Sequence, residues 1–223
     1  MKQKHSIVAE KQSSSTRRES LLQAASELFF EQGYTATSLD AIIRRAGGSK
    51  RAIYTEFGGK KELFLALLKE IGQQNLAVLE GQHGQHSDLR SALNDFAQQT
   101  MSALMSPSAL GLARSIMTEG LRFPELGDTY FRFGPGKMVR LLTDIFAAAI
   151  ERGEIVHSRP EVLASLFLGM LRNTYYFQVV FRMSPVPEAE FLRNEVLGAV
   201  DIFLYGVLHE PKNRRISQNN HAE

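Results

Sequence analysis

Apolar residues recur at intervals of three and four along almost the whole chain, and this spacing is the feature that most constrains the fold. In the segment 16–32, the apolar side chains on one helical face are Leu21, Ala25, Leu28 and Phe29. Such spacing is typical of amphipathic helices, whereas a half-buried strand alternates residue by residue. Neither strand-like alternation nor an internal repeat is evident. The pattern predicts an all-α protein.

Gly, Pro and capping residues divide this pattern into about nine predicted helices. Three short helices come first, with Thr16, Thr37 and Ser49 as their expected caps, and glycines at 33, 47–48 and 58–59 are expected to end them. A fourth helix starts near Lys60. The other five are expected at about 88–105, 108–120, 125–152, 159–182 and 187–208. Pro135, between two glycines, is expected to kink or interrupt the helix 125–152.

Composition excludes several kinds of protein. The chain of 223 residues has no Cys, so disulfides and thiolate metal sites are absent. The apolar run from Ile7 to Ala9 is too short for the core of a signal peptide. No later run approaches the ~18 apolar residues of a membrane span. We therefore expect a soluble, cytoplasmic protein that does not enter a membrane.

Basic residues are concentrated in the N-terminal quarter. Residues 1–61 hold 11 Lys/Arg and 6 Asp/Glu, whereas residues 62–223 hold 15 and 18. This asymmetry favours an N-terminal unit that meets a polyanion. The expected units are a disordered tail (1–15), a basic three-helix domain (16–61), a larger helical domain (62–210) and a second disordered tail (211–223).

The predicted helix after Ser49 has an apolar face and a polar face. With Ile53 pointing inward, Phe57 lies beside it, whereas Arg51 and Thr55 point nearly the opposite way. Two short helices joined by a tight Gly turn form a helix-turn-helix, whose second helix enters the DNA major groove. There, Arg can donate two hydrogen bonds to guanine, while Lys and helix N–H groups bind phosphate. A surface helix with incidental charge fits the same pattern about equally well.

The segment 33–64, "GYTATSLDAIIRRAGGSKRAIYTEFGGKKELF", resembles the DNA-binding region of the TetR family of bacterial transcription regulators. The matching residues are Gly33, Tyr34, Thr37, Ser38, Ile42, Ala46, Gly47, Ser49, Lys50, Ile53, Tyr54, Phe57, Lys60 and Leu63. Gly48, Arg51 and Glu56 depart from the family pattern, where an apolar residue, a Gly and an aromatic residue or His are common. With the first helix, the resemblance covers about residues 16–64.

The resemblance implies a homodimer that binds double-stranded operator DNA, and no cofactor or metal is expected. The implied DNA-binding residues are Thr37, Ser38, Ser49, Lys50, Arg51, Ala52, Tyr54, Thr55 and Lys60. Among these, Thr37, Ser38, Tyr54 and Lys60 are expected at phosphates, and Ser49 to Ala52 in the groove. Arg51 is the expected base reader and Lys60 the expected phosphate anchor at the start of its helix.

Beyond residue 80, the resemblance implies a helical domain for dimerisation and ligand sensing. The stretch "MTEGLRFPELGDTYFRFGPGK" (117–137) is similar to one subgroup of these regulators, with its R-F-P-E-L stretch and a Gly-Pro. The candidate effector-binding residues are Met101, Met105, Met117, Phe131, Phe146, Phe167, Tyr175 and Phe177. Such Met and aromatic stripes are also typical of a plain core. The candidate dimer-interface residues, on two helices that are apolar around much of their circumference, are Leu166, Met170, Val196, Val200, Phe203 and Leu204.

We expect a repressor that leaves its operator when a small apolar or amphipathic effector binds. An activator, an all-α ligand-binding protein or enzyme, and an architectural DNA binder without sequence preference are the alternatives. The sequence has no nucleophile elbow, zincin motif or dinucleotide fingerprint. His83 and His86 lack a nearby carboxylate cluster and make a poor metal site. An enzyme is therefore not expected.

Overall fold

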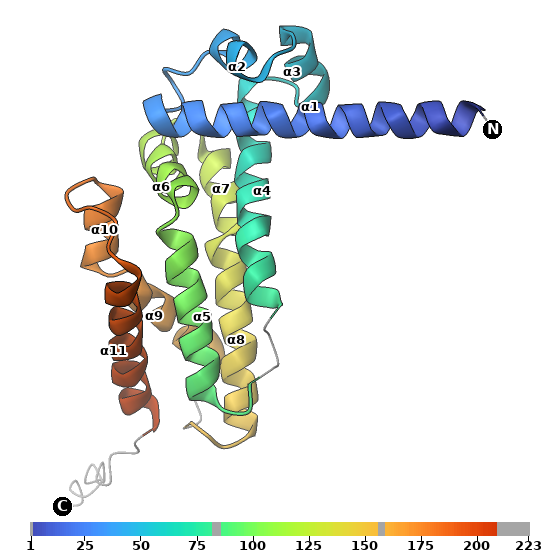
Figure 1. Cartoon of the computed structure of the whole chain (residues 1–223). Helices are drawn as coiled ribbons and strands as arrows, with labels where there is room; N and C mark the ends of the chain where they lie inside the picture. The colour runs from blue at the N-terminus through green and yellow to red at the C-terminus, as the bar shows by residue number, and fades with distance from the viewer. Residues whose placement is uncertain (1, 82–85, 156–158, 209–223) are drawn as a thin grey trace, which may run out of the picture.

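The computed structural model describes residues 2–81, 86–155 and 159–208, and within these ranges the chain is helical with no strand (Figure 1). The helices are α1 (Lys2–Gln32), α2 (Leu39–Ala46), α3 (Lys50–Glu56), α4 (Lys60–Glu80), α5 (Leu89–Leu104), α6 (Pro107–Glu119), α7 (Pro124–Phe133), α8 (Pro135–Glu151), α9 (Pro160–Leu171), α10 (Thr174–Val180) and α11 (Ala189–Leu208). The all-α prediction is confirmed. None of the helices in the described part is long and apolar enough to cross a membrane.

Two of the predicted helices are each divided in the structure. The predicted helix 125–152 is interrupted at Gly134, where Pro135 begins α8 without a backbone N–H to continue the preceding ladder. The predicted helix 159–182 ends at Leu171, and the side chain of Asn173 accepts a hydrogen bond from the backbone N–H of Tyr176 to start α10. Asn competes with helical hydrogen bonding in this way, which favours a cap over a continuous helix.

The N-terminal end of the chain differs from the predicted tail. The structure begins α1 at Lys2, so the segment 2–15, expected as a disordered tail, continues the helix that was expected from Thr16. Lys, Gln, Glu and Ala dominate its first turns, and these residues have high helix propensity. The second predicted tail, 211–223, lies outside the described residues.

Two apolar clusters hold the helices together. The first cluster contains residues of α1, α2, α3 and α4, together with Leu112 of α6 and Leu126 of α7. The second cluster is built mainly from α5, α8, α9 and α11, around the fully buried rings of Phe146 and Phe167. Helix α4 contributes to both, because Ile71 belongs to the first cluster and Leu79 to the second. Helix α4 therefore connects the N-terminal helices to the rest of the protein.

The arrangement places α2 and α3 at one end of the molecule (Figure 1). Helix α4 runs from that end along α7 and α8. Aromatic rings fix the junction: the ring centre of Tyr34 lies 5.5 Å from that of Phe29, 5.1 Å from Phe64 and 5.7 Å from Phe123. Because Tyr34 lies between α1 and α2 and Phe123 precedes α7, the α1–α2 connection packs on the α6–α7 connection as well as on α4.

Candidate DNA interface and ligand cavity

Helices α2 and α3 form a helix-turn-helix around two glycines. Gly47 and Gly48 have φ angles of 79° and 102°, a region that residues with a Cβ rarely adopt. Ser49 then caps α3, since its side chain accepts a hydrogen bond from the N–H of Ala52 at 3.3 Å. Ile42 and Ile53 are fully buried beneath the turn. The predicted turn and the predicted cap of α3 are both confirmed.

The outward face of α3 carries the side chains that the helical spacing placed there. Arg51 and Thr55 are exposed, and Tyr54 is 56% exposed. Ala52 is half-buried at the edge of this face. The face therefore presents a guanidinium group in the first turn, followed by a phenol and a hydroxyl group. Its contact with DNA remains a prediction.

Lys50 sits beside this face but has a partner within the protein. Its Nζ lies 2.9 Å from a carboxylate oxygen of Asp40 in α2, and both side chains are more than half exposed. An exposed ion pair contributes only about 0–1 kcal/mol. The pair with Asp40 therefore orients Lys50 but does not prevent it from binding another anion. Contact of Lys50 with DNA also stays a prediction.

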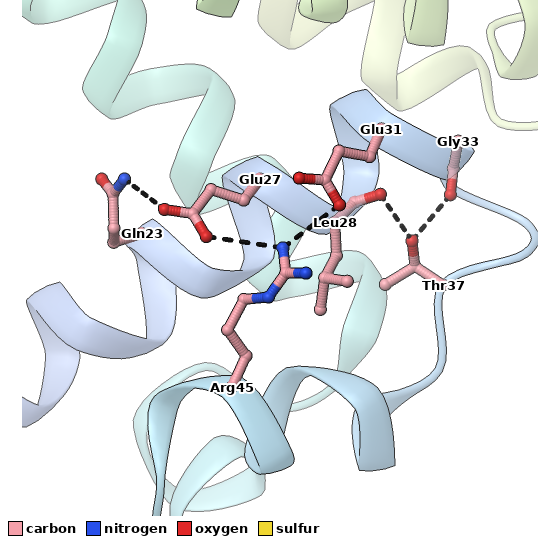
Figure 2. Close-up of polar contacts among 7 residues, drawn as sticks. All are labelled: Gln23, Glu27, Leu28, Glu31, Gly33, Thr37 and Arg45. Carbon is pink, nitrogen blue, oxygen red and sulfur yellow. Dashed lines mark hydrogen bonds and ion pairs between the residues drawn. The ribbon is translucent and has the colours of Figure 1, made fainter.

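Thr37 does not occupy the position that the sequence predicted. It is only 1% exposed, and its hydroxyl group donates to the carbonyl oxygens of Gly33 at 2.8 Å and Leu28 at 3.1 Å (Figure 2). The cap of α2 is instead Ser38, which accepts a hydrogen bond from the N–H of Ala41 at 3.1 Å. The structure therefore corrects the role of Thr37: it ties the turn to α1, and its hydroxyl group is not available to phosphate. Ser38 is exposed and keeps its predicted place at the start of α2.

A second contact fixes α2 on α1. The guanidinium group of Arg45 lies 3.4 Å from Glu27 and 3.2 Å from Glu31, one turn apart on α1. Figure 2 shows Arg45 reaching from α2 up to these two carboxylates, on the α1 side of the motif. Arg45 is therefore held by α1, in contrast to Arg51, and sequence reasoning did not anticipate this clamp.

Lys60 begins α4 and rests against the α1–α2 connection. Its Nζ donates to the carbonyl oxygen of Thr35 at 3.3 Å and lies 4.4 Å from the ring centre of Tyr34. Burial lowers the pKa of Lys60, although the nearby carboxylate of Glu119 raises it in part. The ammonium group is thus half-buried beside Tyr34. Its predicted contact with phosphate is not tested by this arrangement.

Two polar contacts join the helix-turn-helix unit to the α6–α7 region. The hydroxyl group of Thr35 donates to Glu119 at 2.6 Å, and Lys61 lies 3.1 Å from Glu125. Together with the Tyr34–Phe123 ring contact, they make α6 and α7 neighbours of the DNA-binding unit. A movement of α4 relative to α7 would therefore alter how the unit is held.

The eight candidate effector-binding residues do not come together in one cavity. Met117, Phe131 and Phe177 are exposed, and Tyr175 is half-buried. The four that are buried in the second apolar cluster are Met101, Met105, Phe146 and Phe167. None of the eight lines either of the cavities described next. The structure therefore divides this set between the core and the surface, and a role of these residues in effector binding stays a prediction.

A small cavity of about 40 Å³ lies between α4 and the α6–α8 region. Its apolar lining includes Leu68, Ile71, Leu76, Leu104, Leu112, Phe133 and Met138. Gly72 of α4 also lines it, at a point where α4 touches the end of α7 directly. Three polar residues face the same space from three elements: Asn75 of α4, Tyr130 of α7 and Arg172, which follows α9. A mostly apolar cavity with a few convergent polar groups is typical of ligand sites.

The polar side of this cavity is unusual in its hydrogen bonding. Within the described residues, Nε and Nη2 of Arg172 are buried and have no hydrogen-bond partner. Tyr176 is hydrogen-bonded to Tyr130. Burial raises the pKa of Tyr176 to about 12, and the Tyr130 phenol and this hydrogen bond raise it as well. The guanidinium group of Arg172 acts in the opposite direction and lowers it. The phenol of Tyr176 therefore stays neutral, and the positive charge at this side of the cavity comes from Arg172.

A second cavity, of about 100 Å³, lies between α5 and α8. Its lining includes Asp95, Asp144 and Arg152, and His86, whose Nε2 lies 3.4 Å from Asp95. Among the described residues, no group of three or more His, Asp or Glu could hold a metal ion. His83 lies outside the described residues.

The predicted dimer interface is only partly on the surface. The structure corrects four of the six residues, since Val196, Val200, Phe203 and Leu204 are buried in the second apolar cluster. Leu166 is 59% exposed, and Met170 is half-buried. The exposed apolar residues of the neighbouring helices α9 and α11, which we call the α9–α11 face, are Val162, Leu166, Phe191, Leu197, Ile202 and Tyr205. Helix α11 is apolar on two sides, and the four α11 residues predicted for the interface lie on the side that faces the core.

Two family models match the chain. The model described as "Bacterial regulatory proteins, tetR family" matches residues 21–67, and the model described as "AefR-like transcriptional repressor, C-terminal domain" matches residues 91–206. The second match alone covers more than half of the chain. The first match contains α2 and α3, and the second contains the α9–α11 face and most of the lining of the 40 Å³ cavity.

Individual relatives agree with these matches. The transcriptional activator FasR of Mycolicibacterium smegmatis is 51% identical over 53 residues, which are 24% of this chain and 24% of that protein. The chain spans less than half the length of the curated relatives that it matches first.

Solved structures match over almost their whole length. A protein of Mesorhizobium loti, described as a TetR-family transcriptional regulator, has a TM-score of 0.77 and 25% identity, covering 88% of this chain and 98% of that one. The flavonoid-responsive regulator FrrA has a TM-score of 0.67 and 28% identity with the same coverage.

Proposed function

The chain belongs to the TetR family of bacterial transcriptional regulators, and from this premise we propose that it represses transcription by binding an operator as a homodimer. In this proposal, a small amphipathic effector releases it from DNA. The observation that carries the proposal is the outward face of α3, on which Arg51, Tyr54 and Thr55 stand exposed above a buried Ile53. A recognition helix needs such a face to reach base edges in the major groove.

Repression is proposed over activation because of the C-terminal match. The model that matches residues 91–206 is described as that of an AefR-like transcriptional repressor. FasR, an activator, is similar over only 53 residues, 24% of this chain. That short match does not decide the direction of regulation.

The α9–α11 face supports the homodimer. Several large apolar side chains are exposed together on this pair of helices, and monomeric proteins rarely leave a contiguous apolar patch of that kind uncovered. Gly169 of α9 and Gly198 of α11 have no heavy atom within 4 Å of where a Cβ would stand, so a second backbone could approach closely there. A two-fold pair of chains would bury the same face on both partners.

Release from DNA would follow from the position of the 40 Å³ cavity. Its walls include α4, which leads directly from α3, and the α7–α8 region, which carries the contacts to the DNA-binding unit. A ligand that enlarges this cavity would push α4 away from α7 and so change the orientation of α3. FrrA, which is 28% identical, is described as flavonoid-responsive, and this supports a response to a small amphipathic compound.

The experiment that tests DNA recognition compares three single substitutions. Selection of bound genomic fragments with the purified protein first yields an operator. Arg51→Ala should then weaken binding to that operator by about 1–3 kcal/mol and binding to random DNA much less, because a base contact is lost. Lys60→Ala should weaken binding to all sequences about equally and reduce the salt slope by ~1 per subunit, because a phosphate contact is lost.

Arg140→Ala is the matched control, since Arg140 is an exposed arginine on α8, in the C-terminal part. It removes the same charge and should leave both affinities nearly unchanged. Melting curves of all three variants show whether the loss of the Lys60–Tyr34 contact affects folding. Equal losses from Arg51→Ala on the operator and on random DNA would make Arg51 a phosphate contact. No loss of binding from either Arg51→Ala or Lys60→Ala would mean that α3 does not face DNA.

A further inference from the structure

Two nitrogens of the charged guanidinium group of Arg172 have no hydrogen-bond acceptor among the described residues. Arg172 follows the last turn of α9 and lines the 40 Å³ cavity, whose other walls are mostly apolar. Within the described part of the chain, its buried Nε and Nη2 donate to nothing. A buried donor without a partner is costly, and a buried charge is more so. A protein that keeps such a donor despite its cost in folding free energy can use it for binding.

We propose that Arg172 recognises the carboxylate group of an effector whose apolar body extends between α4 and α7. This inference rests on the proposed function, because it assigns the chemistry of the ligand to the cavity described there. A guanidinium group presents a planar fork of N–H donors that matches the two oxygens of a carboxylate. The two unpaired nitrogens, Nε and Nη2, form one side of that fork.

The surroundings of Arg172 fit an anionic head group. The two polar neighbours on the cavity wall, Tyr130 and Asn75, can each donate a hydrogen bond and carry no charge. No Asp or Glu is among the residues that line this cavity, so no carboxylate from those residues competes for the guanidinium group. A carboxylate ligand would therefore satisfy the arginine and face two further neutral donors.

A purely structural role for Arg172 does not explain the geometry. Arginine at the end of a helix can bind the last carbonyl groups, but the buried nitrogens of Arg172 bind none. Arg114 shows what such a role looks like in this protein. Its Nε donates to the carbonyl oxygen of Val180 at 2.6 Å and its Nη2 to that of Val179 at 3.0 Å, at the end of α10. Arg114 therefore serves as the structural counterpart of Arg172.

The cavity is large enough for water and too small for the whole ligand. A space above roughly 10–15 Å³ can hold a water molecule, so the cavity has room for water that a ligand would displace. An apolar body of about ten carbon atoms needs more room than 40 Å³. That room can open only if α4 separates from α7, where Gly72 touches Phe133. Binding of the carboxylate would thus be linked to the movement that releases DNA.

The test measures ligand binding to the full chain without DNA, so it is independent of operator recognition. The probes are decanoate and 2-naphthoate, each paired with its neutral alcohol, 1-decanol or 2-naphthylmethanol, at pH 7 in a calorimeter. The wild-type protein should bind at least one carboxylate more tightly than its alcohol. Arg172→Met should weaken carboxylate binding about 10–100-fold, as expected for lost charge-assisted hydrogen bonds, and leave binding of the alcohol nearly unchanged.

Melting without ligand provides the second measurement. Arg172→Met removes two buried N–H donors that have no partner within the described residues, so its melting temperature should equal or exceed that of the wild type. Arg114→Met is the matched control and should melt at a lower temperature, because it removes two satisfied hydrogen bonds. The inference is overturned if neither carboxylate binds, if carboxylate and alcohol bind equally well, or if Arg172→Met lowers the melting temperature as Arg114→Met does. A protein that binds carboxylates through Arg172 but recognises no operator would instead reject the proposed function alone.

Discussion

Gly72 of α4 touches Phe133 at the end of α7, and Gly72→Ala offers a direct perturbation of that contact. A methyl group on Gly72 would lie 2.6 Å from the carbonyl oxygen of Phe133 and 3.1 Å from its Cβ. The obstacle is largely backbone, so rotation of a side chain cannot relieve it. Gly127→Ala is the matched control, because Gly127 lies in α7 and no heavy atom stands within 4 Å of the added methyl group.

The magnitude follows from the difference between the two variants. Ala stabilises a helix interior by about 0.5–1 kcal/mol relative to Gly, and both variants gain this contribution. Overpacking against backbone costs about 1–3 kcal/mol, and only Gly72→Ala incurs it. We therefore expect Gly127→Ala to be more stable than the wild type, and the free energy of unfolding of Gly72→Ala to be about 1–3 kcal/mol lower than that of Gly127→Ala.

Urea unfolding of the three proteins at equal concentration measures this difference. Gly72 lies twelve residues after Lys60, about 18 Å along α4 at 1.5 Å per residue. A forced separation at Gly72 should therefore tilt α3 and weaken operator binding without any effector, whereas Gly127→Ala should bind the operator as the wild type does. Equal stability of the two variants would refute the packing argument. A destabilised Gly72→Ala that binds the operator normally would refute the link from α4 to α3.

Two further predictions concern the α1–α2 turn and the α9–α11 face. Thr37→Val should lower the free energy of unfolding by about 1–3 kcal/mol, because the buried hydroxyl group donates to the carbonyl oxygens of Gly33 and Leu28. The control Thr55→Val, on the exposed face of α3, should stay within about 0.5 kcal/mol of the wild type. Urea unfolding compares the two variants, and equal effects would contradict the role assigned to Thr37. Leu166→Arg should convert the expected dimer to a monomer, as measured by light scattering. The control Leu121→Arg should leave the dimer intact, because Leu121 is 97% exposed and lies outside this face. A dimer that survives Leu166→Arg would place the interface elsewhere.

The sequence predicted the helices well where local signals decide them. Ser49 and the glycines at 47 and 48 specify the turn before α3 almost without help from the rest of the chain, and the structure has that turn. Two adjacent hydroxyl residues were harder to separate. Thr37 and Ser38 both suit a cap, and Ser38 takes the role only because Thr37 is drawn into the packing against α1. That choice depends on tertiary contacts, which a local pattern does not contain.

The candidate sites depended even more on contacts between distant segments. Helix α11 is apolar on two sides, so its periodicity could not reveal that Val200 faces the core and Ile202 the solvent. Arg172 carried no signal at all, since it stood inside a predicted continuous helix. Its significance appears only when the end of α9 meets Tyr130 of α7 and Asn75 of α4 around one cavity. Unsatisfied buried donors are a property of the folded chain, and a sequence pattern cannot show them.

The position of Gly72 also bears on how an effector could act at all. A ligand changes the equilibrium between two states only by the difference in its affinity for them. In the structure, the cavity beside Arg172 has a volume of only about 40 Å³, and Gly72 touches Phe133 at its wall, so we expect a ligand with a sizeable apolar body to bind a state in which α4 and α7 are separated better than the present one. The separated state is also the one in which α4 no longer holds α3 in its present orientation. A ligand small enough to leave the Gly72 contact intact, such as formate or acetate, should therefore occupy the guanidinium group without releasing the operator. Increasing chain length in a series of carboxylates should convert binding without release into binding with release, and release that is independent of chain length would mean that the separation of α4 from α7 is not the step that frees DNA.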